Sequence, residues 1–218
     1  MARSVRPLLA MGNAKLGQSI FHFDLPAIST CPGRSSVCER VCYATVSRYL
    51  LPSVQERLRW CYEQSRRRDF IGRLVREIRR KGVLVVRLHV SGDFVDASYA
   101  AKWLAVMRQC PRVRFYFYTR SWRVPEIAAV LEQMAALRCC RAWYSIDHDT
   151  GVPQRVPLGV RLAYLQVSEG EQPERADLLF RVRRLRQQRQ PLTLVCPNET
   201  VQGRAQDVNC GNCGRCWQ

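Results

Sequence analysis

VLVVRLHVSGDF, residues 83–94, is a run of apolar and β-branched residues that ends in the turn-forming residues Ser91, Gly92 and Asp93. The first eight residues have the length and composition of a β-strand. Ser-Gly-Asp is a sequence typical of turns and helix caps. The segment therefore predicts a strand with small and polar residues at its carboxyl end.

Similar runs recur along the chain, and helical patterns lie between most of them. The runs of strand length are 19–25, 83–90, 113–119, 141–147, 160–167 and 191–196. Helices are predicted for 53–80, which Gly82 stops, and for 96–109, 125–138 and 172–190. Repeated strand and helix imply right-handed crossovers and a mostly parallel sheet, although the link after Asp147 has little room for a helix. Six strands fit a doubly wound sheet or an open, partial (β/α)6 barrel of the α/β class, and we expect the barrel.

The length of 218 residues suits one substantial core with appendages rather than two domains. We expect residues 1–195 to form the barrel, with an N-terminal cysteine loop at 30–44. Residues 196–218 are expected to form a cysteine-rich, metal-binding segment packed on it. No apolar run approaches the roughly 20 residues that span a bilayer, and the first residues lack the pattern of a signal peptide. We therefore expect a cytoplasmic protein.

The chain carries 35 lysines and arginines against 18 acidic residues, a formal net charge of +17. Such a surplus favours a polyanionic partner, with nucleic acid ahead of an acidic membrane surface. A GC-rich genome explains a preference for arginine over lysine without any binding role, but it does not explain so few acids. We expect nucleic-acid contact and no membrane-embedded segment.

Polar residues follow one predicted strand after another. They are Ser91, Gly92 and Asp93; Thr119, Arg120 and Ser121; Asp147, His148 and Asp149; and Ser168 and Glu169. In parallel α/β folds the carboxyl ends of the strands meet at one edge, where the chemistry gathers. Each group by itself is also ordinary turn chemistry. Their repetition predicts a shared mouth, which the first cysteine loop also borders.

The chain has eleven cysteines, an odd number that favours metal ligands or inert thiols over disulfides in a cytoplasmic protein. One group combines a Cys-Pro at Cys196 with C-x2-C-x2-C spacing at Cys210, Cys213 and Cys216. This combination is typical of a ferredoxin-like [4Fe-4S] cluster. Structural zinc more often takes two separated C-x2-C pairs. The group predicts a metal site, with an iron–sulfur cluster ahead of zinc.

The other group of thiols lies in TCPGRSSVCERVCYA, residues 30–44, and consists of Cys31, Cys38 and Cys42. Three thiols are one short of a closed zinc site, which would need His22 or Asp24 as its fourth ligand. An iron–sulfur cubane held by three cysteines needs no fourth protein ligand, and its open iron can bind a small molecule. Cys196 could in principle complete this first site instead of the second. The four other cysteines show no ligand spacing and are interpreted as core or surface thiols.

A three-cysteine loop after the first strand of a partial β/α barrel resembles the radical S-adenosylmethionine enzymes. In that superfamily three thiolates hold a [4Fe-4S] cluster whose unique iron chelates the methionine moiety, and reduction of the bound sulfonium yields a 5′-deoxyadenosyl radical. The resemblance implies Cys31, Cys38 and Cys42 as ligands, although their C-x6-C-x3-C spacing differs from the common C-x3-C-x2-C. It also maps the glycine-rich segment that receives the methionine amino group onto residues 91–93, with Asp93 in place of the usual glutamate.

The order of motifs over nearly the whole chain is similar to that of the phage "gene product 88" domain family. The shared motifs are NAKLG (13–17), TCPG with CERVCYA (30–44), HVSGDF (89–94), FYFYTRSW (115–122) and CGNCGRCW (210–217). This resemblance implies a viral or mobile-element origin. It identifies relatives rather than a reaction.

These features lead to the hypothesis of a small iron–sulfur enzyme of radical S-adenosylmethionine type. It would act on nucleic acid or nucleotides and take its electron from a separate donor. Asp93, Ser145 and Asp147 would contact the cofactor, with Ser91 and Gly92 beside them, and Arg120 would pair with a carboxylate or phosphate. The alternatives are a metal-stabilised nucleic-acid-binding protein without chemistry, and a metal-dependent nuclease that uses Asp93, Asp147 and Asp149.

Overall fold

The computed structural model describes residues 6–171, 173–187 and 194–218. Within them the strands form a single seven-stranded sheet whose order follows the chain. The strands are β1 (Ala10–Asn13), β2 (Gly17–Phe23), β3 (Val85–Leu88), β4 (Arg114–Thr119), β5 (Cys140–Ile146), β6 (Val160–Gln166) and β7 (Leu178–Arg181). β1 and β2 pair antiparallel, and every later neighbour pairs parallel. Because the strand order does not reverse within the sheet, the doubly wound arrangement is excluded.

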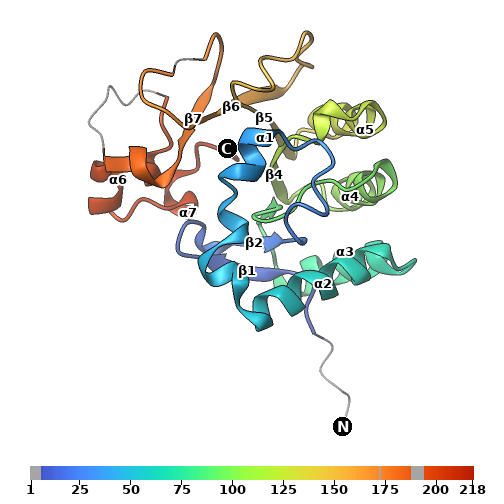
Figure 1. Ribbon diagram of the computed structural model, residues 1–218. Helices are drawn as coiled ribbons and strands as arrows, with labels where there is room; N and C mark the ends of the chain where they lie inside the picture. The colour runs from blue at the N-terminus through green and yellow to red at the C-terminus, as the bar shows by residue number, and fades with distance from the viewer. Residues whose placement is uncertain (1–5, 172, 188–193) are drawn as a thin grey trace.

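Helices cover one face of the sheet (Figure 1). Those on this face are α2 (Pro52–Arg66), α3 (Phe70–Lys81), α4 (Ala97–Gln109) and α5 (Pro125–Ala135). The shorter elements are α1 (Ser36–Arg40), α6 (Val201–Ala205), α7 (Cys210–Cys213), η1 (Tyr43–Thr45), η2 (Ser47–Leu50), η3 (Ser121–Arg123), η4 (Arg183–Gln187) and η5 (Pro197–Glu199). α6 and α7 lie on the side of the sheet away from α2–α5 (Figure 1). No helix among the described residues has the length and apolar character to cross a membrane.

The main core lies between the sheet and α2–α5. Val86 and Leu88 of β3 point into it, and so does Phe117 of β4. Trp103 of α4 is completely buried and meets the ring of Phe23 edge to face, with centroids 5.5 Å apart. Burying a large apolar side chain contributes about 1.5–3 kcal/mol, so this layer supplies most of the driving force that fixes the sheet.

The opposite face of the sheet is covered by the C-terminal segment. Alternate residues of the same strands point this way, because side chains along a strand alternate between faces. Val85 and Tyr116 pack here against Cys210 and Cys216. Next to them a second small cluster combines Trp143, Ala163, Leu178 and Cys196. The last 23 residues therefore form part of the core of this second face.

The mixed α/β fold with a mostly parallel sheet is confirmed, and the five predicted strand runs between 19 and 167 all contain strands. The helix predicted for 53–80 is two helices, α2 and α3, divided at 67–69. Gly82 ends α3 in the left-handed conformation, as predicted. The hairpin strand β1 was not predicted, because its four residues carry too short a pattern to detect.

The end of the sheet differs most from the prediction. The helix predicted for 172–190 is wrong where the chain is described, because residues 178–181 form β7 and 183–187 form η4. Leu178 is completely buried beside Trp143, which fixes this segment as a strand along β6. The strand predicted for 191–196 is reduced to a single bridge between Val195 and Leu179, and residues 191–193 lie outside the described part.

Candidate functional site

The cysteine loop, residues 30–44, follows β2 and lies at the carboxyl ends of the parallel strands. Its helix α1 is capped by Ser35, whose hydroxyl accepts a hydrogen bond from the Cys38 backbone N–H at 3.0 Å. Such a cap satisfies a helix N–H that otherwise has no partner. Ser35 therefore fixes the first turn of α1, which contains Cys38.

The loops after three strands hold the cysteine loop in place. The Ser35 hydroxyl donates to Asp147 after β5 at 2.6 Å. Arg123 after β4 donates from Nη1 to the carbonyl oxygens of Gly33 and Arg34 at 3.1 and 3.0 Å. A Cβ on Gly33 would lie 2.0 Å from the Arg120 carbonyl oxygen, so only glycine allows this approach. Long-range contacts thus shape the loop, since its own short α1 helix could not.

Ser91 and Gly92 hold the loop from the end of β3. The Ser91 hydroxyl donates to the Leu25 carbonyl at 2.9 Å. Gly92 has φ +78°, and a Cβ there would lie 2.6 Å from the Leu25 Cβ and 2.7 Å from the Thr30 Oγ1. Both residues predicted to bind a cofactor therefore brace the chain that leads into the cysteine loop.

Asp93 is a buried carboxylate that the protein itself supplies with donors. It accepts from the Thr119 hydroxyl at 2.6 Å and from the backbone N–H groups of Arg120 at 2.8 Å, Ser121 at 3.3 Å and Phe94 at 2.8 Å. Burial raises the pKa of Asp93 above its ordinary value, and these donors oppose the rise. With its oxygens occupied, Asp93 holds the turn after β4. Its predicted role as receiver of an amino group stays a prediction.

Arg120 and Asp147 form a buried ion pair beneath the cysteine loop. Arg120 Nη1 lies 2.8 Å from Asp147 Oδ2, with side-chain exposures of 7% and 0%. The same nitrogen donates to the Ser145 carbonyl at 3.3 Å, while the other Asp147 oxygen accepts from the N–H groups of Asp149 and Thr150. The Ser145 backbone thus takes part, and its side chain is half-buried. The structure therefore brings these predicted site residues together as a support for the loop.

The three thiols of the loop are half-buried. Burial raises the pKa of Cys31 to about 12, and the nearby Asp93, Cys38 and Cys42 add to the rise. Burial also raises the pKa of Cys42, against the backbone N–H groups of Ala44 and Thr45, which favour its thiolate. The Cys-Tyr-Ala ending of the loop therefore provides donors for a deprotonated sulfur.

His22 and Asp24, considered as a fourth zinc ligand, already have partners. His22 Nδ1 lies 2.6 Å from Asp24 Oδ2, and its Nε2 lies 3.3 Å from the Gly12 carbonyl oxygen. The other Asp24 oxygen accepts from the Val90 N–H at 2.7 Å. This pair ties β1 and β2 to the end of β3, and neither residue is free to complete the first cysteine group.

The C-terminal thiols line one small cavity of ≈ 20 Å³. Its cysteines are Cys196, Cys210, Cys213 and Cys216. Burial raises the pKa of Cys196 to about 12, with Lys15 opposing the rise and Cys216 and Cys210 adding to it. Asn209 caps α7 and directs its first turn, through bonds to the N–H groups of Gly211 and Asn212. Cys196 thus belongs with the second group rather than the first.

All eleven cysteines, each within the described residues, are free. The four without ligand spacing are buried: Cys61, Cys110, Cys139 and Cys140. In the part of the chain that the structure describes, no group of three or more His, Cys, Asp or Glu side chains is placed so that it could hold a metal ion.

Several residues at this edge of the sheet were missed by reasoning from the sequence. Ile28 and His89 adopt positive φ angles of 67° and 59°, which are unusual for residues with a Cβ and occur more often at functional sites. A second cavity, with ≈ 690 Å³ of empty space, lies after β5 and β6 and is lined in part by His148, Tyr164 and Glu171. The Asp147-His148-Asp149 sequence indicated part of it, but nothing local indicated the backbone strain.

These observations define a class of protein: a mostly parallel α/β sheet with a braced three-cysteine loop at its carboxyl edge and a four-cysteine cavity on the face that the C-terminal segment covers. The chain belongs to the gene product 88 family, whose model matches residues 7–218. The predicted kinship with phage proteins is thereby confirmed.

Two relatives come from mycobacteriophages. The "Gene 88 protein" of Mycobacterium phage L5 is 29% identical over 152 residues, which cover 64% of this chain and 62% of the relative. The "Gene 88 protein" of Mycobacterium phage D29 is 27% identical over 155 residues, covering 65% and 63%. The matches therefore span less than two thirds of the length of these relatives. No solved structure matches the chain.

Proposed function

We propose that this chain is an iron–sulfur protein of radical S-adenosylmethionine type, built on an open, partial β/α barrel and acting on nucleic acid or nucleotides. Cys31, Cys38 and Cys42 would hold a [4Fe-4S] cluster, and the C-terminal cysteines a second metal centre. When bound, a cubane with three protein ligands supplies an open iron for a small molecule such as S-adenosylmethionine and an electron for its cleavage.

One observation carries the proposal: three half-buried thiols lie in one short loop that is braced by the ends of β3, β4 and β5. Asp93 is the acidic group that acts on Cys31, and its oxygens are already occupied by four protein donors. The residues that would complete a closed zinc site, His22 and Asp24, bond to each other. The thiolates of a cubane bind different irons, so they need not converge on one point.

The chain's own residues have distinct tasks in this proposal. Arg120 and Asp147 hold the loop in place, and Ser35 caps the start of α1, the helix that carries Cys38. The N–H groups of Ala44 and Thr45 stabilise the Cys42 thiolate. The cavity lined by His148, Tyr164 and Glu171 lies beside Asp147 and offers polar groups to a bound ligand.

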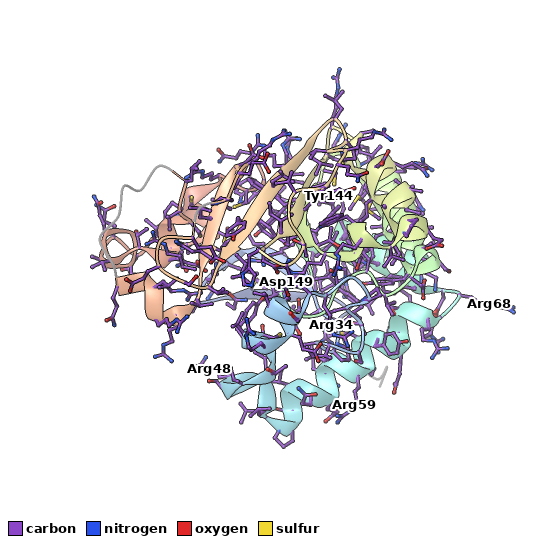
Figure 2. The ribbon with its side chains drawn as sticks, turned by 45° about the horizontal axis from the view of Figure 1, so that its top comes forward. Arg34, Arg48, Arg59, Arg68, Tyr144 and Asp149 are labelled. Atoms are coloured by element: carbon purple, nitrogen blue, oxygen red, sulfur yellow. The ribbon has the colours of Figure 1, made fainter. Side chains whose placement is uncertain are left out.

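The net charge of +17 supports nucleic acid as the partner. Arginines point outward from the ribbon along η2, α2 and the turn after it, at Arg48, Arg59 and Arg68 (Figure 2). By contrast, the metal-dependent nuclease gains no support, since Asp93 and Asp147 are buried and already paired within the protein. A phosphate-tracking surface next to the site is the arrangement that the proposal requires.

Anaerobic purification followed by iron, acid-labile sulfide and zinc analysis tests the proposal. Iron with sulfide, and a spectrum that changes when S-adenosylmethionine is added, is the expected result. The change should disappear in Cys38→Ser and persist in the matched variant Cys61→Ser, which alters a buried thiol outside both groups. A colourless protein with stoichiometric zinc would overturn the enzymatic proposal and favour a metal-stabilised nucleic-acid-binding protein.

A further inference from the structure

Arg87 lies in the middle of the sheet, on the face that the C-terminal segment covers. Its neighbours on β3, Val86 and Leu88, point into the main core, whereas Val85 lies in the cluster on the other face. Arg87 follows Val85 by two residues and so shares its face. It is only 8% exposed, although it carries a full charge.

The charge of Arg87 has no counter-charge among the described residues. Its guanidinium lies 5.9 and 5.3 Å from the ring centroids of Tyr116 and Tyr118. Its Nε has no hydrogen-bond partner, nor do the hydroxyls of the two tyrosines. No carboxylate of the described ranges pairs with it. Because an unpaired buried charge strongly destabilises a fold, this arrangement indicates an anion that side-chain carboxylates do not supply.

Two of the C-terminal thiols pack against the aromatic neighbours of this cation, which also interacts with Tyr43 of the first cysteine loop. Cys210 and Cys216 pack in the same cluster as Tyr116 and Tyr118, and Cys196 lies in the adjoining one. As neutral thiols these residues would leave the arginine unbalanced.

A surplus of positive charge is also found around Glu199, three residues after Cys196. Lys15 Nζ lies 2.8 Å from Glu199, and Arg186 Nη2 lies 2.9 Å from the same carboxylate oxygen. Two cations thus share one buried carboxylate, which is 2% exposed. Lys15 also acts on Cys196. Four thiolates outnumber the positive charges of a zinc ion or an oxidised cubane, so a metal centre here would carry the missing negative charge.

We propose that Arg87 is the counter-cation of a metal–thiolate centre formed by Cys196, Cys210, Cys213 and Cys216, and that its charge stabilises the metal-bound form of this centre. This inference rests on the second metal centre of the proposed function. The tyrosines exclude water from the guanidinium, so the attraction is only weakly screened. A positive charge near a redox-active centre also favours its reduced form.

The test isolates the second centre by replacing Cys31, Cys38 and Cys42 with serine in the full chain. Arg87→Gln and Arg87→Lys are then compared after anaerobic reconstitution with ferrous iron and sulfide, followed by titration with an iron chelator. Arg87→Gln should lose its metal at about 10- to 100-fold lower chelator concentration, because outer-sphere partners contribute about this much to metal affinity. Arg87→Lys, which keeps the charge, should stay close to the parent protein.

A matched control separates the charge from the loss of an arginine. Arg161→Gln removes an exposed arginine that also lies over an aromatic ring of the sheet, 5.4 Å from the Trp143 centroid. It should retain metal like the parent. If Arg87→Gln and Arg161→Gln behave alike, Arg87 is not the counter-cation.

Melting temperatures provide a readout independent of metal affinity. In metal-free protein, Arg87→Met should melt at or above its parent, because it removes an unpaired buried charge. In reconstituted protein the same variant should melt below its parent. Equal destabilisation in both states would show that Arg87 serves the fold alone and would overturn the inference.

Failure of the two proposals can be distinguished. If the variant lacking the first three cysteines binds no iron or zinc, the second centre and the role of Arg87 are both wrong. The first centre is then decided by the reciprocal variant, with Cys210, Cys213 and Cys216 replaced by serine. Iron and sulfide in that protein would leave the radical-type proposal intact.

Discussion

Replacing Asp147 by asparagine should destabilise the protein strongly, because Arg120 would keep a buried charge without its counter-ion. The two side chains are 7% and 0% exposed, and their charged atoms lie 2.8 Å apart. Breaking a buried ion pair from one side costs about 3–5 kcal/mol. Since 1 kcal/mol corresponds to about 2–4 °C for a chain of this size, the melting temperature should fall by roughly 6–20 °C.

Thermal unfolding, monitored by circular dichroism, measures this effect. Two further variants serve as controls. Asp69→Asn breaks an exposed pair with Arg67 and should leave the midpoint nearly unchanged. The double variant Arg120→Met/Asp147→Asn removes both charges, so it should be less destabilised than the sum of its single variants. The reasoning is refuted if Asp147→Asn melts within about 2 °C of the parent, or if the two single effects simply add.

Three further predictions concern the loop, the thiols and pH. Gly92→Ala should cost at least about 1–2 kcal/mol in urea unfolding, because a side chain at φ +78° is strained; an unchanged midpoint would contradict this. Cys38→Ser should lower iron content and activity with little effect on melting, whereas Cys213→Ser should also harm folding, and equal loss of stability in both would argue against separate roles. Burial opposes the charged form of His22, but Asp24 outweighs it and raises the pKa above 6.5. The stabilisation from this pair is therefore complete below pH 6.5 and is lost as pH rises through the raised pKa, so His22→Gln should flatten the melting profile above pH 6.5. A parallel profile for His22→Gln and parent would refute that assignment.

Local pattern was sufficient for most of the regular structure. The composition of 83–90 and 113–119 predicts the strands found there. Gly82 ends α3 because a residue without a Cβ adopts the left-handed conformation easily. At 178–181 the same reasoning failed. The pairing of this short segment with β6 and the burial of Leu178 decide its conformation, and both are non-local.

The spacing of the cysteines by itself predicted two groups, since C-x2-C-x2-C and C-x6-C-x3-C describe neighbours along the chain. Sequence could not tell whether a carboxylate after a strand is free or already paired. Asp147 meets Ser35 across 112 residues, and Asp93 meets Thr119 across 26. Likewise, the sequence shows Arg87 only as one charge in an apolar run. Its burial and its interaction with Cys210 appear only in the folded chain. Charges and hydrogen bonds depend on distances in space, and only the folded chain sets those distances between residues remote in sequence.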